Sequence, residues 1–187
     1  MIHENSCKKI LLSLIFLEFL EVTFMEIERK FLVGTVPFDL SQFPHTEIEQ
    51  GYICTSPTLR IRSMGDAYIL TVKELALPRT GSDAPIVNRE EEFSLSRETF
   101  QKLKGKCEGR FVSKTRYRIP LRQVMNDGLY CGLVAELDVF HGVHEPLRLV
   151  EVEFADIESA NAFVPPDWFG EDVSHDSRYR NASLSKL

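Results

Sequence analysis

Carboxylates two residues apart recur in this sequence, in stretches where apolar residues fill the alternate positions. The pairs are Glu26 with Glu28, Glu90 with Glu92, Glu136 with Asp138, and Glu151 with Glu153. Side chains at positions i and i+2 of a β-strand point to the same face, so each pair would place two carboxylates side by side. Such oxygen-rich arrangements bind hard divalent cations, Mg²⁺ or Mn²⁺ among them.

Basic residues fill equivalent alternate positions in the same and in neighbouring stretches. They are Lys30, Arg60, Arg62, Lys114, Arg116 and Arg118. Arginine makes bidentate contacts with phosphate oxygens, whereas lysine acts as a point charge. Together with the acidic pairs, these residues predict a cavity for a small polyanion that divalent metal ions help to neutralise.

The elements that must position these side chains are strands, because the dominant pattern from residue 25 onward has a period of two. A helix capped by Ser96 is expected to run to about residue 104, and a second over 157–163, where Pro165 and Pro166 follow. Residues 75–87 read as an exposed loop. Strands are expected near 26–33, 48–54, 58–64, 67–74, 87–95, 111–119, 132–140 and 147–154.

Two architectures satisfy this alternation. In one, the charged face of an open sheet meets water; in the other, the sheet closes on itself and the charges point into its lumen. Buried charges are costly unless they are paired or neutralised, so a closed lumen would have to be a site. We expect Glu90 and Glu92 to point inward, since Phe93 and Leu95 then face the following helix; a one-residue slip would reverse this.

Length and composition predict one soluble, acidic domain. The 187 residues, 43% of them hydrophobic, suffice for a single core. Twenty-two Lys and Arg against 28 Asp and Glu give a net charge of -6, which argues against general nucleic-acid binding. The four cysteines form no C-x-x-C pair, as expected of a reduced cytoplasmic chain.

The first 24 residues differ from the rest. The run KKILLSLIFLEFLEVTF (8–24) resembles the apolar region of an export signal, but Glu18 and Glu21 interrupt it and no small-residue cleavage site follows. It is also shorter than the roughly 20 residues of a membrane span. We expect residues 1–24 to be an extension outside the native domain, with 25–187 as the domain; a surface-lying helix and a true export signal are the alternatives.

An ordered set of motifs resembles the CYTH superfamily, the triphosphate tunnel metalloenzymes, and in particular its bacterial single-domain tripolyphosphatases. The set covers essentially all of residues 25–187. It consists of MEIERKFLV (25–33), QGYI (50–53), LRIR (59–62), YILTVK (68–73), EEEF (90–93), KTRYRIP (114–120), ELDVFHG (136–142), LVEVEF (149–154) and DVSHDSRYRNASL (172–184).

The resemblance implies an α+β fold that is mainly antiparallel β, with an eight-stranded β-tunnel (barrel), a charged lumen and helices packed outside. It implies a linear triphosphate bound with Mg²⁺ or Mn²⁺, as two ions. By motif, the metals would be held by Glu26, Glu28, Asp138, Glu151 and Glu153, with Glu90, Glu92 and Glu136 as other tunnel acids. The phosphates would be bound by Lys30, Arg60, Arg62, Lys73, Arg116 and Arg118.

Lys114 matches the strand lysine that activates the attacking water in the tripolyphosphatase branch. Crowding by Arg116 and Arg118 would disfavour its charged form and lower its pKa enough for general-base catalysis. The alternative is that Lys114 is one more phosphate contact. Tyr52 is a candidate site-lining hydroxyl and Arg178 a candidate phosphate contact at the tunnel mouth; either could equally be a packing or surface residue.

The function that this resemblance implies is metal-dependent hydrolysis of a terminal phosphoanhydride, with inorganic tripolyphosphate giving pyrophosphate and phosphate. A tunnel lined almost wholly by charge offers no aromatic slot for a base or thiazole ring. Class IV adenylyl cyclase, thiamine triphosphatase and a non-catalytic polyphosphate or nucleotide sensor are the alternatives. We expect a small polyanion as the partner, with no nucleic acid and no membrane, and a homodimer is compatible with the sequence.

Overall fold

The structure is a computed structural model that describes residues 24–75, 86–122 and 132–187, with side chains for all of these except 24–26, 74–75 and 86–89. Residues 1–23 of the predicted extension and most of the predicted loop 75–87 therefore lie outside the described residues. None of the described helices is both long enough and apolar enough to cross a membrane.

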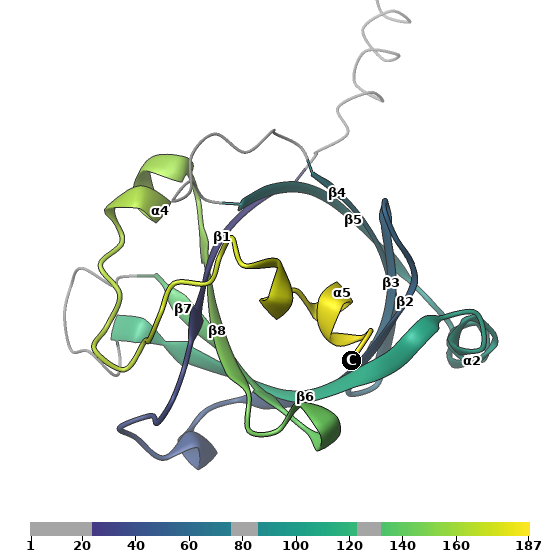
Figure 1. Cartoon of the computed structure of the whole chain (residues 1–187), viewed down its shortest axis with the longest axis horizontal. Helices are drawn as coiled ribbons and strands as arrows, with labels where there is room; N and C mark the ends of the chain where they lie inside the picture. Colours follow the sequence, from purple (N-terminus) through teal and green to yellow (C-terminus); the bar gives the residue numbers. More distant parts are fainter. Residues whose placement is uncertain (1–23, 76–85, 123–131) are drawn as a thin grey trace, which may run out of the picture.

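The described residues form eight antiparallel strands that close into a barrel, in the order β1-β5-β4-β3-β2-β6-β7-β8 (Figure 1). Each predicted strand is present, with ends within three residues of the prediction. Of the two predicted architectures, the closed one is correct. The strands are β1 (Phe24–Leu32), β2 (His45–Thr55), β3 (Thr58–Met64), β4 (Ala67–Leu75), β5 (Ile86–Ser94), β6 (Glu108–Pro120), β7 (Val134–Phe140) and β8 (Arg148–Phe154).

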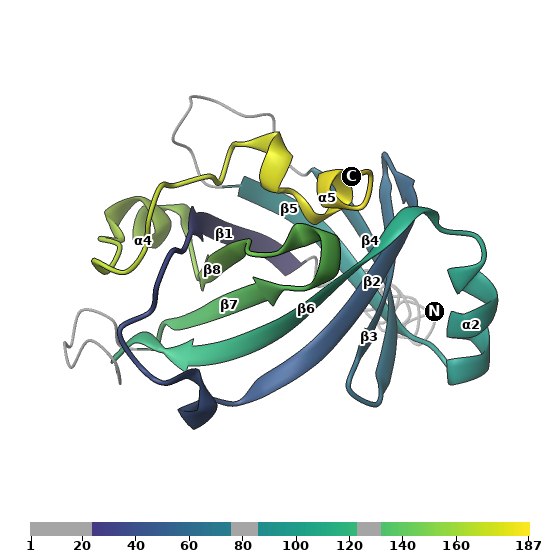
Figure 2. The same ribbon diagram turned by 60° about the horizontal axis from the view of Figure 1, so that its bottom comes forward.

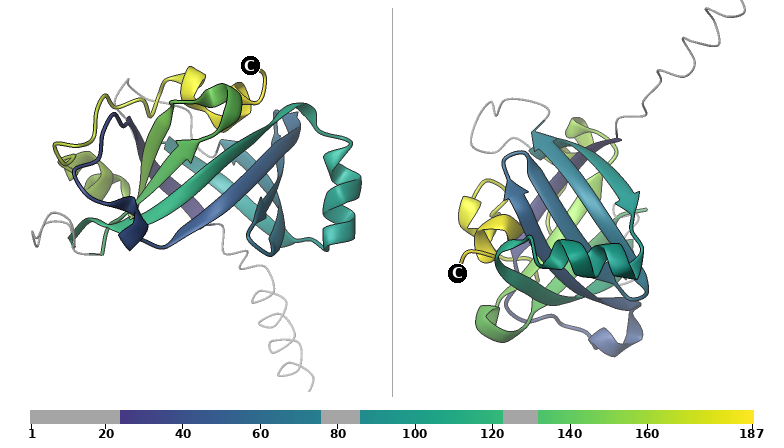
Figure 3. Two further views of the ribbon diagram at one scale, coloured as in Figure 1. Left: turned by 90° about the horizontal axis from the view of Figure 1, so that it is seen from below. Right: turned by 90° about the vertical axis from the view of Figure 1, so that its right-hand side faces the viewer.

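Both predicted helices are confirmed, and both lie outside the barrel (Figure 3). In α2 (Arg97–Lys104), the Ser96 hydroxyl accepts the Thr99 N–H at 3.1 Å, as a helix cap does. In α4 (Ile157–Ala162), Asp156 caps the first turn in the same way. The part of the chain that the structure describes also contains the short helical turns η1 (Leu40–Gln42), η3 (Gly142–His144), η4 (Ser177–Tyr179) and α5 (Asn181–Leu184).

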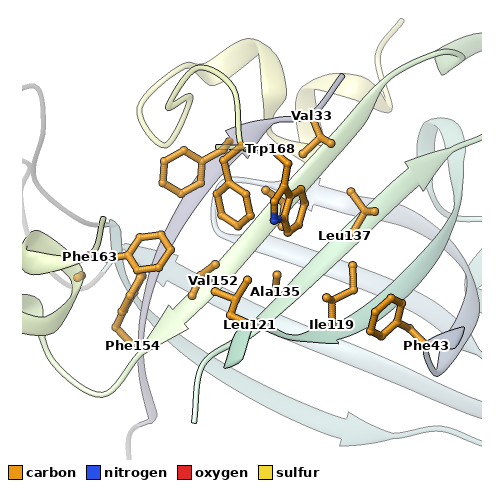
Figure 4. Close-up of a cluster of buried hydrophobic side chains, with 14 of the residues drawn as sticks. Val33, Phe43, Ile119, Leu121, Ala135, Leu137, Val152, Phe154, Phe163 and Trp168 are labelled. Carbon is orange, nitrogen blue, oxygen red and sulfur yellow. The ribbon is translucent and has the colours of Figure 1, made fainter. Parts of the chain in front are cut away.

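The main apolar core lies on the outer face of the barrel wall, between β1, β6, β7, β8 and the segment that follows α4 (Figure 4). The Phe31 ring packs between the rings of Phe163 and Phe169, with centroids 6.1 and 5.0 Å away. Because side chains alternate along a strand, burying Phe31 outside the wall turns Lys30 inward. The apolar half of the pattern thus fixes the orientation of the charged half.

The C-terminal tail (residues 171–187) closes one end of the barrel, where η4 and α5 lie across the opening (Figures 1 and 2). Val173 and Leu184 of the tail form a small apolar cluster with Val112, Phe140 and Leu149. These three strand residues share the inward parity of Lys114, Asp138 and Glu151. The barrel therefore has an apolar floor, and the prediction of a tunnel lined almost wholly by charge was wrong at this end.

Gly109 is where β6 passes under this tail. Its φ is +69°, and a Cβ built there would lie 2.3 Å from the carbonyl oxygen of Ser185, which accepts the Arg110 N–H. We expect Gly109→Ala to lower the free energy of unfolding by about 2–3 kcal/mol, because backbone strain and a backbone clash act together. Gly65→Ala is the matched control, since Gly65 also has positive φ but open space around it. Equal losses in urea unfolding of the two variants would contradict a tail clash.

Candidate active site

A dense ion-pair network fills one wall of the lumen, over β1, β6, β7 and β8. Lys30 Nζ lies 2.8 Å from Glu151 Oε1, and Lys114 Nζ donates to Asp138 Oδ2. The Arg116 guanidinium contacts three carboxylates: Glu136, Asp138 at 2.7 Å and Glu151 at 2.6 Å. Lys30, Lys114, Asp138 and Glu151 are all buried. This wall thus brings the predicted catalytic residue Lys114 together with the predicted phosphate contacts Lys30 and Arg116. The predicted metal ligands Asp138 and Glu151 are part of the same network.

The opposite wall carries a second network, on β3, β4 and β5. Arg60 reaches Glu90 at 3.1 Å and Arg62 reaches Glu92 at 2.5 Å. Both arginines cross β4 to do so, and they face the lumen, because Arg116 of the first wall is among the charges that lower the pKa of Arg62. The predicted inward register of Glu90 and Glu92 is therefore correct. The reason given for it was wrong in part, because Phe93 is 49% exposed instead of covered by α2.

Two guanidinium donors on this wall are buried without an acceptor. Arg60 Nε and Arg62 Nε have no hydrogen-bond partner among the described residues. Burial and the neighbouring Arg60 lower the pKa of Arg62, which shows how closely the cations are crowded. Unsatisfied buried donors are rare and call for an explanation, and an anion in the lumen would supply the missing acceptors.

Lys114 is the most deeply buried cation of the site, with 2% of its surface exposed. Burial lowers the pKa of Lys114 to about 8, and Arg116 adds to the shift although Asp138 opposes it. The pKa of Lys114 is lowered, as predicted, but the predicted cause of this shift was wrong in part. Desolvation outweighs cation crowding, and Arg118 is not among the causes.

The carboxylates form an oxygen-rich group toward the middle of β1, β7 and β8. Glu28 lies opposite Glu153 in the strand register, and Lys30 opposite Glu151. Burial, then Glu136, Glu28 and Glu151, raise the pKa of Glu153, so negative charge is concentrated around it. The Glu26 side chain lies outside the described residues.

The chemistry of these side chains suits hard divalent cations, because most of the donors are carboxylate oxygens. A cation would also relieve the repulsion between Glu153 and the neighbouring carboxylates. Among the described residues, no three carboxylate, imidazole or thiol groups already form a metal centre. Asp138 and Glu151 are bound to lysine and arginine instead. Metal binding by these two carboxylates therefore requires the ion pairs to rearrange.

Comparison with known proteins identifies the family to which this chain belongs. No family model matches the sequence. The inorganic triphosphatase of Nitrosomonas europaea is 42% identical over 165 residues, which cover 86% of this chain and 96% of that protein. The chain belongs to the inorganic triphosphatase family. The inorganic triphosphatase of Acetivibrio thermocellus is 32% identical, over 86% of this chain and 93% of its own.

Solved structures agree with this assignment to the inorganic triphosphatases. The crystal structure of an inorganic triphosphatase superposes with a TM-score of 0.61 at 39% identity, covering 87% of this chain and 95% of that one. A Hippeastrum protein described as a putative adenylyl cyclase with dominant triphosphatase activity shares the fold, at 17% identity and a TM-score of 0.51 over 73% and 83% of the chains. The resemblance to triphosphate tunnel metalloenzymes is confirmed.

In this family member the structure adds Gln50 to the lumen residues that were predicted, among which Tyr52 was a candidate hydroxyl. Gln50 is buried and donates to the buried Tyr52 hydroxyl at 3.1 Å. Burial raises the pKa of Tyr52 although cations from three other strands oppose the shift, namely Arg60, Lys30 and Lys73. The Tyr52 hydroxyl thus lies close to side chains that are proposed to bind phosphate. The Q-G-Y motif was visible in the sequence, but nothing there marked Gln50 as buried.

Two predicted phosphate contacts are largely exposed to solvent. Arg118 bonds to Glu136 at 2.8 Å, but 61% of its side chain is exposed. Arg178 lies on η4 of the tail, 78% exposed, and binds Asp176 at 2.5 Å. Arg118 therefore lies at the edge of the ion-pair network, and Arg178 lies with η4 at an opening of the barrel, where a mouth contact was predicted.

Proposed function

We propose that this chain hydrolyses the terminal phosphoanhydride of inorganic tripolyphosphate to pyrophosphate and phosphate, with two Mg²⁺ or Mn²⁺ ions. The observation that carries the proposal is the pair of buried guanidinium donors, Arg60 Nε and Arg62 Nε, which face a lumen ringed by cations and lack acceptors among the described residues. Family membership at 42% identity supports the same substrate.

The chain's own residues divide into two sets by charge. The carboxylates Glu26, Glu28, Asp138, Glu151 and Glu153 would hold the metal ions. When bound, these ions supply Lewis-acid polarisation and neutralise phosphate charge. Binding would exchange part of the internal ion pairs for metal–carboxylate and phosphate–cation contacts. The phosphate oxygens would be bound by Lys30, Arg60, Arg62, Lys73 and Arg116.

Lys114 is the proposed general base. Its neutral Nζ would take a proton from the attacking water, and Asp138 fixes the amine through the hydrogen bond to Oδ2. Arg116, bound to the same carboxylate, keeps positive charge beside the amine. Arg116 would thereby favour the neutral amine before each turnover.

The pH dependence of kcat/KM tests this role, because kcat/KM reports the pKa values of the free enzyme. With the pKa of Lys114 at about 8, the catalytic neutral form is the minor one at pH 7. We expect kcat/KM for tripolyphosphate to rise about tenfold per pH unit below that value and to level off above it. The measurement is a stopped-time phosphate assay at saturating Mg²⁺. A flat profile between pH 6.5 and 9 would exclude a titrating base of this kind.

Substrate choice is tested with the full chain, Mg²⁺ or Mn²⁺, and tripolyphosphate, ATP and thiamine triphosphate in parallel. We expect fast, metal-dependent phosphate release from tripolyphosphate and little from the others. Formation of cyclic AMP from ATP would identify a cyclase. Tight binding of tripolyphosphate without any product would identify a sensor.

A further inference from the structure

The last residues of β1 pair with β8 along one edge and with the C-terminal tail along the other. Among the described residues, β5 begins opposite Glu28, so the edge of Lys30 to Leu32 has no described β5 partner. The tail takes this place: Leu32 N–H donates to the Glu171 carbonyl at 2.9 Å and Val173 N–H to the Lys30 carbonyl at 2.8 Å. The tail thus completes the barrel wall beside the lysine of the E-x-E-x-K motif.

Ser174 ends this pairing with its side chain. The Lys30 N–H donates to Ser174 Oγ at 2.9 Å, where a strand would offer a carbonyl. Ser174 in turn donates from its hydroxyl and its backbone N–H to Asp172 Oδ1, at 2.5 and 2.9 Å. Both Ser174 and Lys30 are buried, so this hydrogen bond is shielded from water.

Asp172 connects the same serine to the outer helix. Its Oδ2 accepts from Arg29 Nε at 3.0 Å and from Arg29 Nη2 at 2.7 Å. Arg29 Nη1 reaches the carbonyl oxygens of Ala160 in α4 and Phe163, at 3.2 and 3.0 Å. A continuous chain of hydrogen bonds therefore runs from α4 to the backbone of Lys30.

The anchored tail also sets the boundary of the ion-pair network. The apolar floor under Val173 and Leu184 contains Leu149 and Phe140, and Leu32 packs against it. Each of these three strand residues lies two positions from a charged lumen residue, which is the spacing of neighbours on one face of a strand. The charged neighbours are Lys30, Asp138 and Glu151. A displaced tail would therefore disturb the ion-pair network at the residues that form it.

We propose that Asp172 and Ser174 are positioning residues for Lys30, holding its strand so that the ammonium group meets the phosphate. This inference rests on the proposed function of the lumen. Ser174 acts on the backbone of Lys30 and Asp172 acts through Ser174, so neither is proposed to bind the substrate. Their effect follows from geometry, since a displacement of about 1 Å at a binding group can cost up to about a hundredfold in rate or affinity.

The test measures affinity directly, by calorimetric titration of the full chain with Mg²⁺ and the imido analogue of tripolyphosphate, whose bridging nitrogens resist hydrolysis. We expect Ser174→Ala to weaken binding about tenfold, and to raise KM for tripolyphosphate with kcat within about twofold. Ser174→Thr keeps the hydroxyl and should restore most of the affinity. Asp172→Asn, of the same size as the native residue, should give a smaller loss in the same direction.

A double-mutant cycle separates positioning from general stabilisation. If Ser174 acts through Lys30, Ser174→Ala should change the affinity of a Lys30→Gln chain by less than about twofold. Asp156→Ala is the matched control, because it removes a helix cap outside the barrel and should lower Tm without changing the affinity. Unchanged affinity in Ser174→Ala, or an undiminished loss in the Lys30→Gln background, would overturn the inference. Neither result touches the proposed function, which fails only if the wild-type chain does not hydrolyse tripolyphosphate.

Discussion

Replacing Lys114 with methionine should lower kcat for tripolyphosphate by about 10²–10⁴-fold, the range for a general base, while the affinity for the imido analogue stays within about threefold. Methionine keeps most of the volume of the buried stem and removes only the amine. Asp138, which binds Lys114, would still be paired with Arg116 at 2.7 Å, so no orphaned carboxylate is created. Single-turnover phosphate release and calorimetric binding measure the two quantities separately.

Lys73→Met is the control for this prediction, because Lys73 is a lumen lysine without a proposed proton-transfer role. It lies 3.1 Å from Glu90 on the opposite wall. We expect Lys73→Met to raise KM with little change in kcat, as loss of a binding contact does. If Lys114→Met shows that same pattern, Lys114 is a phosphate contact and the general base must be sought elsewhere.

Much of the fold was predictable because charge and apolarity alternate so strictly. In β1, Ile27 and Phe31 enter the outer core while Glu28 and Lys30 are buried on the lumen side, as the E-x-E-x-K spacing indicated. Periodicity alone could not distinguish an open sheet from a barrel, since either presents one charged face. That choice depends on the pairing of β1 with both β5 and β8, and the family resemblance supplied it.

The tail could not be predicted in the same way. Val173 and Leu184 stand in a polar segment without helical or strand periodicity, and the contact of Ser174 with Lys30 spans 144 positions. The overall fold, and not a local pattern of residues in the sequence, brings the tail to the apolar end of the barrel. For the same reason the sequence located Lys114 among cations but could not show that desolvation is the larger cause of its lowered pKa.

Replacing Arg116 with methionine should lower the free energy of unfolding at pH 7 by about 3–5 kcal/mol, the cost of removing one partner from a buried ion pair. Arg116 contacts Glu136, Asp138 and Glu151, so its loss leaves three lumen carboxylates with fewer counter-charges. Arg118→Met is the neighbouring control. It removes one largely exposed ion pair and should cost no more than about 1 kcal/mol.

The pH dependence of this loss identifies its electrostatic origin. Burial would raise the pKa of Glu151, but Lys30, Arg116 and Lys114 outweigh it and hold the pKa well below its ordinary value. A lowered folded-state pKa stabilises the protein above the unfolded-state value of about 4.3, and that stabilisation is lost as pH falls through the folded-state pKa. Without Arg116 the pKa of Glu151 rises. The stability difference in urea unfolding should therefore be full at pH 7 and shrink below about pH 4. A loss of equal size at both pH values would assign the effect of Arg116 to packing instead of charge.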